Sequence, residues 1–196
     1  MHPTSYTVNK LFKNGDYEKL ESRFKRIISG ARSNAVIAYA YQNLVIIYME
    51  TNIYNDAHEC ITKVKELGFH NSVILSINES TLLIKECRYN EAETMINNCL
   101  KDKHLSKQHE VLLKNNLADI MIHTNRINDA KNTLDNLLSE NPTNAVLLVT
   151  LGDLYMIQNN VSNAKEVYVK SLQYNKNNYS LVQHVRNQLN LINTKS

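Results

Sequence analysis

Residues 125–130 read Asn125-Arg126-Ile127-Asn128-Asp129-Ala130, and four other segments of the chain repeat this six-residue phrase. The other versions occupy residues 15–20, 52–57, 87–92 and 159–164. The final residues of successive versions are separated by 37, 35, 38 and 34 positions. A spacing of roughly 20–50 residues is typical of stacked structural repeats. The phrase therefore predicts an architecture of stacked repeats. None of its residues indicates a particular ligand.

Each phrase predicts the end of one helix and the start of the next. The first version begins with Gly15 and three others begin with asparagine, and both residue types tolerate the left-handed conformation of a helix C-terminus. Cys87 begins the third version, and we expect a distorted turn or a different helix ending there. The sixth residue is alanine in every version except the first, which has Leu20. A small residue at this place lets two helices approach closely.

Apolar residues at helical spacing lie on both sides of each phrase, so each repeat is predicted to be an antiparallel helix pair. The 196 residues include only four glycines and two prolines, and 43% are hydrophobic, which favours a helical chain with few long loops. Gly68 and Pro142 mark two turns between repeats. The expected helices cover residues 5–14, 17–30, 36–50, 54–67, 72–86, 90–101, 108–124, 128–140, 145–158, 162–174 and 179–192.

The pattern resembles the tetratricopeptide repeat, a helix–turn–helix unit of about 34 residues. The last repeat matches best, through Leu151-Gly152, Tyr155, Ala164 and Tyr168, and Pro142 precedes it where the family commonly has a proline. The fourth repeat, with Leu117-Ala118 and Ala130, matches nearly as well. Earlier repeats depart from the pattern, since Val45 and Ser80 stand where glycine or alanine is usual. The chain also has no tryptophan.

The resemblance implies an all-α fold, a right-handed α-solenoid of about five antiparallel helix pairs followed by a C-terminal capping helix. A single domain over residues 1–196 would hold repeats at residues 1–34, 38–71, 73–106, 111–144 and 145–178, with the capping helix at 179–192. In that last segment Leu181, Val185 and Ile192 form an apolar face, whereas Gln183 and Asn187 make the other side polar. A half-polar terminal helix of this kind covers the open end of a repeat stack.

Composition and motifs exclude several classes of function. The net charge of +3 is too small to imply a polyanionic partner. The three cysteines form no CxxC pair, and we expect buried reduced thiols. His104 and His109 are five residues apart and so lie on different helix faces, and no phosphate loop or hydrolase motif occurs. We therefore expect no catalytic residue, no metal and no cofactor, and a protein that is not an enzyme.

No apolar stretch approaches the length of a membrane span, and no leader-like block follows Lys10 and Lys13. We therefore expect a cytoplasmic protein without a membrane span.

The resemblance also implies that one stripe of each first helix lines an inner surface that binds a peptide. Counting back from the turns assigns to this stripe an unusually apolar set of side chains with a few polar ones. The set is Tyr39, Gln42, Ile46, Met49, Ile74, Ile77, Thr81, Ile84, Leu112, Asn115, Asp119, Ile122, Val146, Val149, Asp153 and Met156. Some family members clamp an acidic peptide terminus at such places, but Gln42, Ile46 and Asn78 do not fit that clamp.

The expected function is a non-enzymatic scaffold, chaperone or adaptor that binds an apolar peptide or helix of another protein in this groove. Two alternatives stay open. The first is nucleic-acid binding through the basic first repeat, with Tyr6, Phe12, Tyr17 and Phe24 as candidate stacking residues. The second is a homo-oligomeric assembly factor related to secretion or pili.

Overall fold

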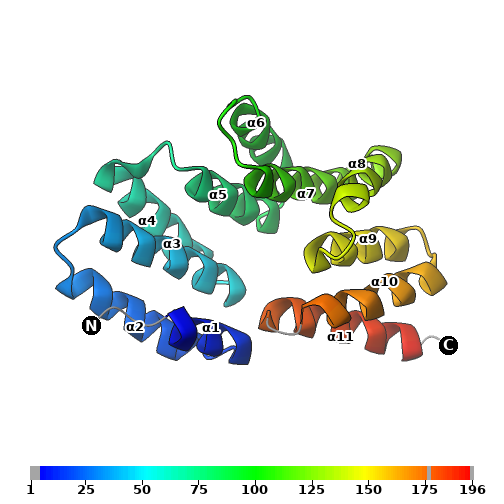
Figure 1. Cartoon of the computed structure of the whole chain (residues 1–196), viewed down its shortest axis with the longest axis horizontal. Helices are drawn as coiled ribbons and strands as arrows, with labels where there is room; N and C mark the ends of the chain where they lie inside the picture. Colours follow the sequence, from blue (N-terminus) through cyan, green and yellow to red (C-terminus); the bar gives the residue numbers. More distant parts are fainter. Residues whose placement is uncertain (1–4, 176–177, 195–196) are drawn as a thin grey trace. The chain divides into compact units, whose positions relative to one another are not determined.

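The computed structural model describes residues 5–175 and 178–194. Eleven α-helices and one π-helical turn occur in this part of the chain, and no strand (Figure 1). The predicted helix ends agree with the observed ones to within three residues, which confirms the all-α solenoid of helix pairs. The elements are α1 (Ser5–Asn14), α2 (Tyr17–Gly30), α3 (Asn34–Glu50), α4 (Tyr54–Val64), the π turn η1 (Lys65–Phe69), α5 (Val73–Lys85), α6 (Tyr89–Cys99), α7 (Lys107–His123), α8 (Ile127–Glu140), α9 (Ala145–Ile157), α10 (Val161–Tyr174) and α11 (Tyr179–Thr194).

The helices form two compact units, which we call unit 1 (Met1–Leu113) and unit 2 (Lys114–Ser196). In unit 1, α3 is the central helix, because it packs against α2, α4 and α5 (Figure 1). The core of this unit contains Leu20 and Phe24 from α2, Leu44 and Ile47 from α3, and Ile61 from α4, all at most 2% exposed. The expectation of a single domain over the whole chain stays a prediction.

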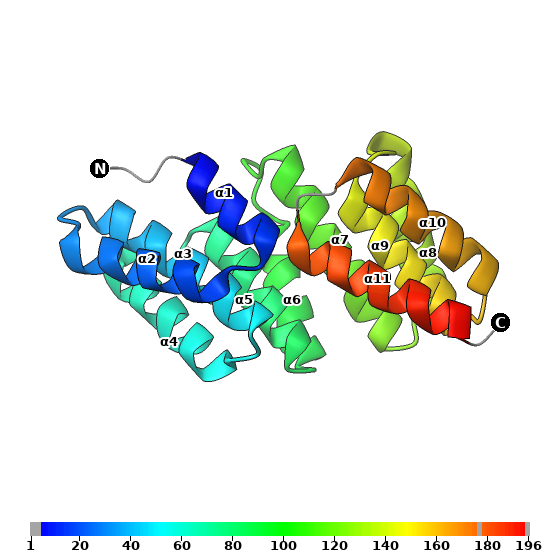
Figure 2. The same ribbon diagram turned by 90° about the horizontal axis from the view of Figure 1, so that it is seen from below.

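In unit 2, α9 and α10 pack against each other along their lengths, and α11 lies beside α10 and reaches α9 (Figure 2). Leu181, Val185 and Ile192 of α11 join a buried cluster with Tyr168 of α10. Arg186, on the same helix, is exposed. α11 is thus the predicted C-terminal capping helix, with one apolar face against the last helix pair.

The repeated phrase ends the first helix of each pair with a left-handed residue. The backbone φ angle is 71° at Gly15, 59° at Asn52, 61° at Asn125 and 55° at Asn159, as predicted. The next residue donates its N–H to the carbonyl five residues back, as in Ile53 to Tyr48 at 2.8 Å, which is the hydrogen bond of a Schellman motif.

The turn at Cys87 in the third repeat is regular, so the expectation of a distorted turn or a different helix ending was wrong. The φ of 60° at Cys87 is that of the asparagines, and the N–H of Arg88 donates to the carbonyl of Leu83 at 2.8 Å. The turn is therefore the same as in the other repeats, because the packing of α5 against α6 requires it. Cys87 is exposed and Cys99 is half-buried, so of the predicted buried thiols only Cys60 is in the interior.

Two buried positions vary in size together in the last four helix pairs, whereas the first pair has the large residues Val8 and Phe24 at these positions. A side chain at Gly152 of α9 would overlap the ring of Tyr168 in α10, so the glycine makes room for this ring. In the other pairs a larger residue at the first position accompanies a smaller residue at the second. The position seven before the turn residue holds Val45, Ser80, Ala118 and Gly152, and the position nine after it holds Ile61, Ile96, Leu134 and Tyr168.

Candidate functional site

The first two turns of α3, α5 and α7 present large apolar side chains at one shared repeat position. Tyr39, Ile74 and Leu112 each lie 13 residues before the left-handed turn residue, and they are 52%, 47% and 39% exposed. All three belong to unit 1. They were predicted as members of the inner stripe, and the structure leaves them open to solvent.

The neighbours of these side chains are ordered by specific contacts. The ring of Tyr39 packs edge-on against that of Phe24, with 6.2 Å between ring centroids. The Nε2 atom of Gln42 donates to Ser72 Oγ at 3.4 Å, which joins α3 to the start of α5. The Nδ2 atom of Asn78 donates to the carbonyl of Gln42 at 3.4 Å. These contacts fix α3 and α5 relative to each other beneath the predicted stripe. Ile46, Ile77 and Thr81, which also belong to the stripe, are half-buried.

Four members of the predicted stripe lie in the interior. Met49, Ile84 and Ile122 are 4%, 8% and 4% exposed, and Asn115 is 7% exposed. The first three stand three residues before a turn residue, in the last helical turn, where the chain bends back and the helix pair closes. We therefore place these four side chains in the core and not on a binding surface.

The members of the predicted stripe on α9, in unit 2, contact other helices of the protein. Val146, Val149 and Met156 of α9 are half-buried against the apolar cluster that α11 completes. Asp153 accepts a hydrogen bond from the hydroxyl of Tyr168 at 2.6 Å, and Nε2 of His184 lies 2.8 Å from the same oxygen. The side chain of Asp153 is thus engaged by α10 and α11.

Asp119 is paired in a different way, within its own helix. Nε2 of His123 lies 3.4 Å from its Oδ1. The hydrogen bond to Asp119 raises the pKa of His123, against the effect of partial burial. Asp119 and Asp153 occupy the same repeat position, six residues before the turn residue. The i,i+4 spacing of Asp119 and His123 could have been found in the sequence, whereas nothing marks Asp153 and His184, 31 residues apart.

The candidate stacking residues for nucleic acid are mostly used in packing. Phe24 is fully buried, and Phe12 and Tyr17 pack edge-on at 6.5 Å and border the core of unit 1. The side chain of Tyr6 lies outside the described part of the structure. The basic repeat therefore offers little aromatic surface for bases.

Residues 5–175 and 178–194 contain neither a cluster of metal-ligating side chains nor a helix that could span a membrane. No group of three or more histidine, cysteine or carboxylate side chains is arranged to hold a metal ion there. Within the same residues, no helix is both long and apolar enough to span a membrane.

The fold and the turn geometry define a helical-repeat protein, and comparison with known families identifies which one. The family model described as Iml2/Tetratricopeptide repeat protein 39 matches residues 28–147, more than half of the chain. A second model, described as Tetratricopeptide repeat, matches residues 125–189. The chain belongs to the tetratricopeptide-repeat family.

Solved structures with a similar fold share little sequence with this chain. Pseudomonas aeruginosa PilF has a TM-score of 0.60 at 16% identity, over 97% of this chain and 87% of PilF. The P58(IPK) TPR domain has a TM-score of 0.48 at 16% identity, and the match covers 95% of this chain but only 54% of that domain. YrrB, described as a TPR protein with an unusual peptide-binding site, has a TM-score of 0.48 at 14% identity, over 91% and 88% of the two chains. No curated protein sequence matches the chain.

Proposed function

We propose that this protein is a non-enzymatic scaffold that binds an apolar peptide or helix of a partner protein through unit 1. The proposed surface comprises the exposed apolar side chains in the first two turns of α3, α5 and α7 and the half-buried residues beside them on α3 and α5. One observation carries the proposal: Tyr39, Ile74 and Leu112 are exposed at the same repeat position on three first helices. The stacked helices of a tetratricopeptide-repeat protein form an interaction scaffold, and this chain has that fold.

Contact of these apolar side chains with water is unfavourable, so a partner that covers them gains free energy. Each large apolar side chain gains roughly 25 cal/mol for every Å² removed from water. Single exposed apolar residues are ordinary, but a row at one repeat position is typical of an interaction surface. A helical or extended partner segment presents apolar side chains at a regular spacing and can cover such a row. Gln42 and Thr81 lie beside the row and supply polar groups that orient the segment.

The test compares two triple variants of the whole chain. Tyr39→Glu/Ile74→Glu/Leu112→Glu places three carboxylates on the proposed surface. Ile157→Glu/Val169→Glu/Leu191→Glu changes the charge equally at apolar side chains of unit 2 that are 44–51% exposed. Host proteins captured by the wild type are identified by mass spectrometry, and their segments are then measured as synthetic peptides.

We expect the unit 1 variant to lose peptide affinity by at least about tenfold, because charge must be desolvated on binding. The unit 2 variant should bind as the wild type does. Circular dichroism of all three chains should show the same helical content, since every altered side chain is exposed. Equal affinity of both variants for the captured segments would contradict the proposal.

The two other functions stay predictions with direct tests. Sedimentation over a concentration range tests homo-oligomerisation, and the unit 1 variant should change it only if the same surface joins two copies. Filter binding at low and moderate salt tests nucleic-acid binding, which would appear as tight binding that falls steeply with salt.

A further inference from the structure

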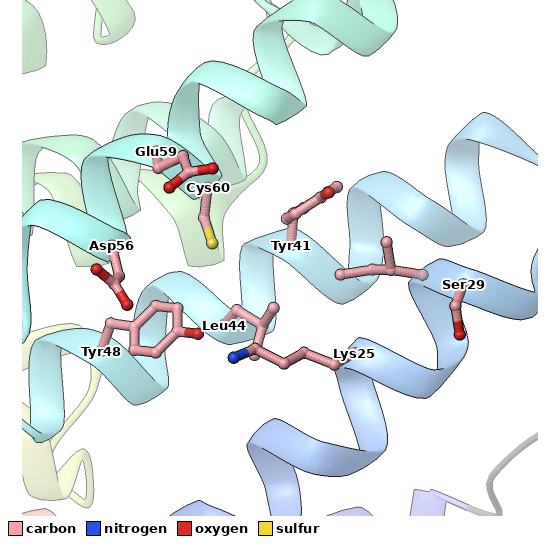
Figure 3. Close-up of a pocket in the computed structure, with 9 residues that line it drawn as sticks. Lys25, Ser29, Tyr41, Leu44, Tyr48, Asp56, Glu59 and Cys60 are labelled. Carbon is pink, nitrogen blue, oxygen red and sulfur yellow. The ribbon is translucent and has the colours of Figure 1, made fainter.

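A separate cleft lies between α2, α3 and α4 of unit 1. Its volume is about 330 Å³, at the small end of the roughly 300–1,000 Å³ of ligand pockets. Figure 3 shows α3 as its floor, with α2 and α4 as its walls. The lining residues include Lys25 of α2, Tyr41 and Leu44 of α3, and Asp56, Glu59 and Cys60 of α4.

The cleft lies on a different side of α3 from the surface of the proposed function. Tyr41 is two residues after Tyr39, and successive residues of an α-helix are separated by about 100°, so the two side chains point about 200° apart. The cleft also has no copy in the next repeat, where Ser76 and Glu79 replace Tyr41 and Leu44. The cleft is therefore specific to these three helices and is not a property of the repeat.

The only cation lining the cleft is already neutralised. Nζ of Lys25 lies 2.7 Å from Oε1 of Glu21, and the hydroxyl of Tyr48 donates to the same carboxylate at 2.9 Å. These contacts raise the pKa of Lys25 and lower that of Glu21, so both stay charged and paired at neutral pH.

The opposite wall carries two carboxylates without such a partner. Asp56 and Glu59 are three residues apart on α4 and so share one helix face. Among the described residues, neither forms a hydrogen bond or an ion pair. Lys63, one turn beyond Glu59, is bonded to Glu66 at 2.9 Å, and the charge of Glu59 acts on Lys63 only through a weaker Coulombic attraction without a contact. The cleft therefore has an excess of negative charge over an apolar floor.

The effect of these carboxylates extends to the interior of the cleft. Cys60 is 6% exposed, and its sulfur points between the two walls (Figure 3). Burial, reinforced by the charges of Glu59 and Asp56, raises the pKa of the Cys60 thiol to about 12. The thiol is therefore neutral at physiological pH, and it adds apolar surface to the site and no nucleophile.

We propose that this cleft binds an arginine side chain of a partner protein, with the guanidinium on Asp56 and Glu59 and the alkyl part over Leu44 and Cys60. A guanidinium has five N–H donors and can serve two carboxylates at once. Its flat face can stack on the ring of Tyr41, and its stem covers apolar surface. This site is independent of the proposed function, since it uses other side chains on another face.

The test is a titration of the isotope-labelled whole chain followed by NMR. The probe is the peptide acetyl-Ala-Leu-Arg-Leu-Ala-amide, and its control has citrulline, the uncharged analogue, in place of arginine. We expect the arginine peptide to shift the amide signals of α2, α3 and α4 around the cleft in a saturable way. The citrulline peptide should bind at least about tenfold more weakly, because a neutral side chain gains little from the carboxylates.

Asp56→Asn/Glu59→Gln should lower the affinity for the arginine peptide by about tenfold, which corresponds to about 1.4 kcal/mol of binding free energy. Asp129→Asn/Glu140→Gln is the matched control, because it makes the same change in net charge at exposed positions of α8 and should leave the affinity unchanged. Glu59→Gln alone, in the middle of α4, gives the same answer if Asp56 proves necessary for folding. Equal binding of the two peptides, an effect of the control variant equal to that of the cleft variant, or no saturable shift at the cleft would each overturn the proposal.

Discussion

The first helices of unit 1 and unit 2 use the same repeat positions for different purposes. In unit 1 the position six residues before the turn holds Ile46 and Thr81, and the exposed row of Tyr39 and Ile74 lies on the same helix faces. In unit 2 that position holds Asp119 and Asp153, each with a histidine partner. The backbone repeat thus fixes where a side chain lies, and the chemistry of the side chain decides whether it stays exposed or pairs with another side chain of the protein.

The largest expected effect is a loss of stability that distinguishes the buried members of the predicted stripe from its exposed members. Ile122→Glu in α7 should lower the free energy of unfolding by more than about 3 kcal/mol or prevent folding, since it buries a carboxylate at a 4% exposed position. Leu112→Glu, in the same helix and 39% exposed, should cost less than about 0.5 kcal/mol. Urea unfolding measures both. Similar losses for the two variants would contradict the placement of these side chains.

The next effect tests the size balance between helices of a pair. Gly152→Ala should destabilise the protein by about 3 kcal/mol, because its methyl group would overlap the buried ring of Tyr168. The fourth repeat already combines an alanine with a leucine at these positions, as Ala118 and Leu134. Gly152→Ala/Tyr168→Leu should therefore recover part of the loss. A double variant less stable than Gly152→Ala alone would show that size is not what limits this contact.

A smaller effect concerns the polar contact that joins α9 and α10. Tyr168→Phe removes the hydroxyl that donates to Asp153 at 2.6 Å but keeps the ring. A hydrogen bond to a charged group contributes roughly 1.5–3 kcal/mol, and Asp153 keeps its contact with His184, so we expect a loss near the lower value, about 1.5 kcal/mol. Thermal unfolding at neutral pH measures it, with Tyr155→Phe as a control elsewhere on α9. Unchanged stability of Tyr168→Phe would mean that water replaces the hydroxyl fully.

The turn that ends α5 should gain stability from a substitution. Cys87 has a φ of 60°, and the left-handed conformation costs a residue with a side chain roughly 1–2 kcal/mol. Cys87→Gly should raise the free energy of unfolding by about 1 kcal/mol, reduced in part by the greater freedom of glycine in the unfolded chain. Asn125→Gly, at the equivalent turn, should change it by only a few tenths of that, because asparagine already tolerates this conformation. A loss of stability in Cys87→Gly would show that the cysteine side chain makes a contact that favours the turn.

Cys87 also shows what could be read from the sequence. The turns that begin with glycine or asparagine were predictable because they depend on residues close together and on a period repeated five times. At Cys87 the residue type predicted a distorted turn or a different helix ending, and this was wrong, because the backbone follows the other turns. The burial of Met49, Ile84 and Ile122 was not predictable, because it depends on how far the two helices of a pair overlap. The cleft beside Asp56 combines three helices, so its charges look in the sequence like ordinary solvated faces.

The smallest effect uses pH to compare the two aspartate–histidine pairs of unit 2. Because Asp119 raises the pKa of His123 above its ordinary value of about 6.5, the folded state holds this proton more tightly than the unfolded chain. The resulting stability is fully present below about pH 6.5 and is lost as the pH rises through the folded pKa. The side chains of His123 and Asp119 are 47% and 36% exposed, so solvent screening limits the loss to a few tenths of a kcal/mol. Urea unfolding between about pH 5.5 and 8.5 should show this decline in the wild type, and Asp119→Asn should flatten that part of the profile while leaving the contact between His184 and Asp153 in place. The same slope in both proteins would show that the pair in α7 is not coupled to folding.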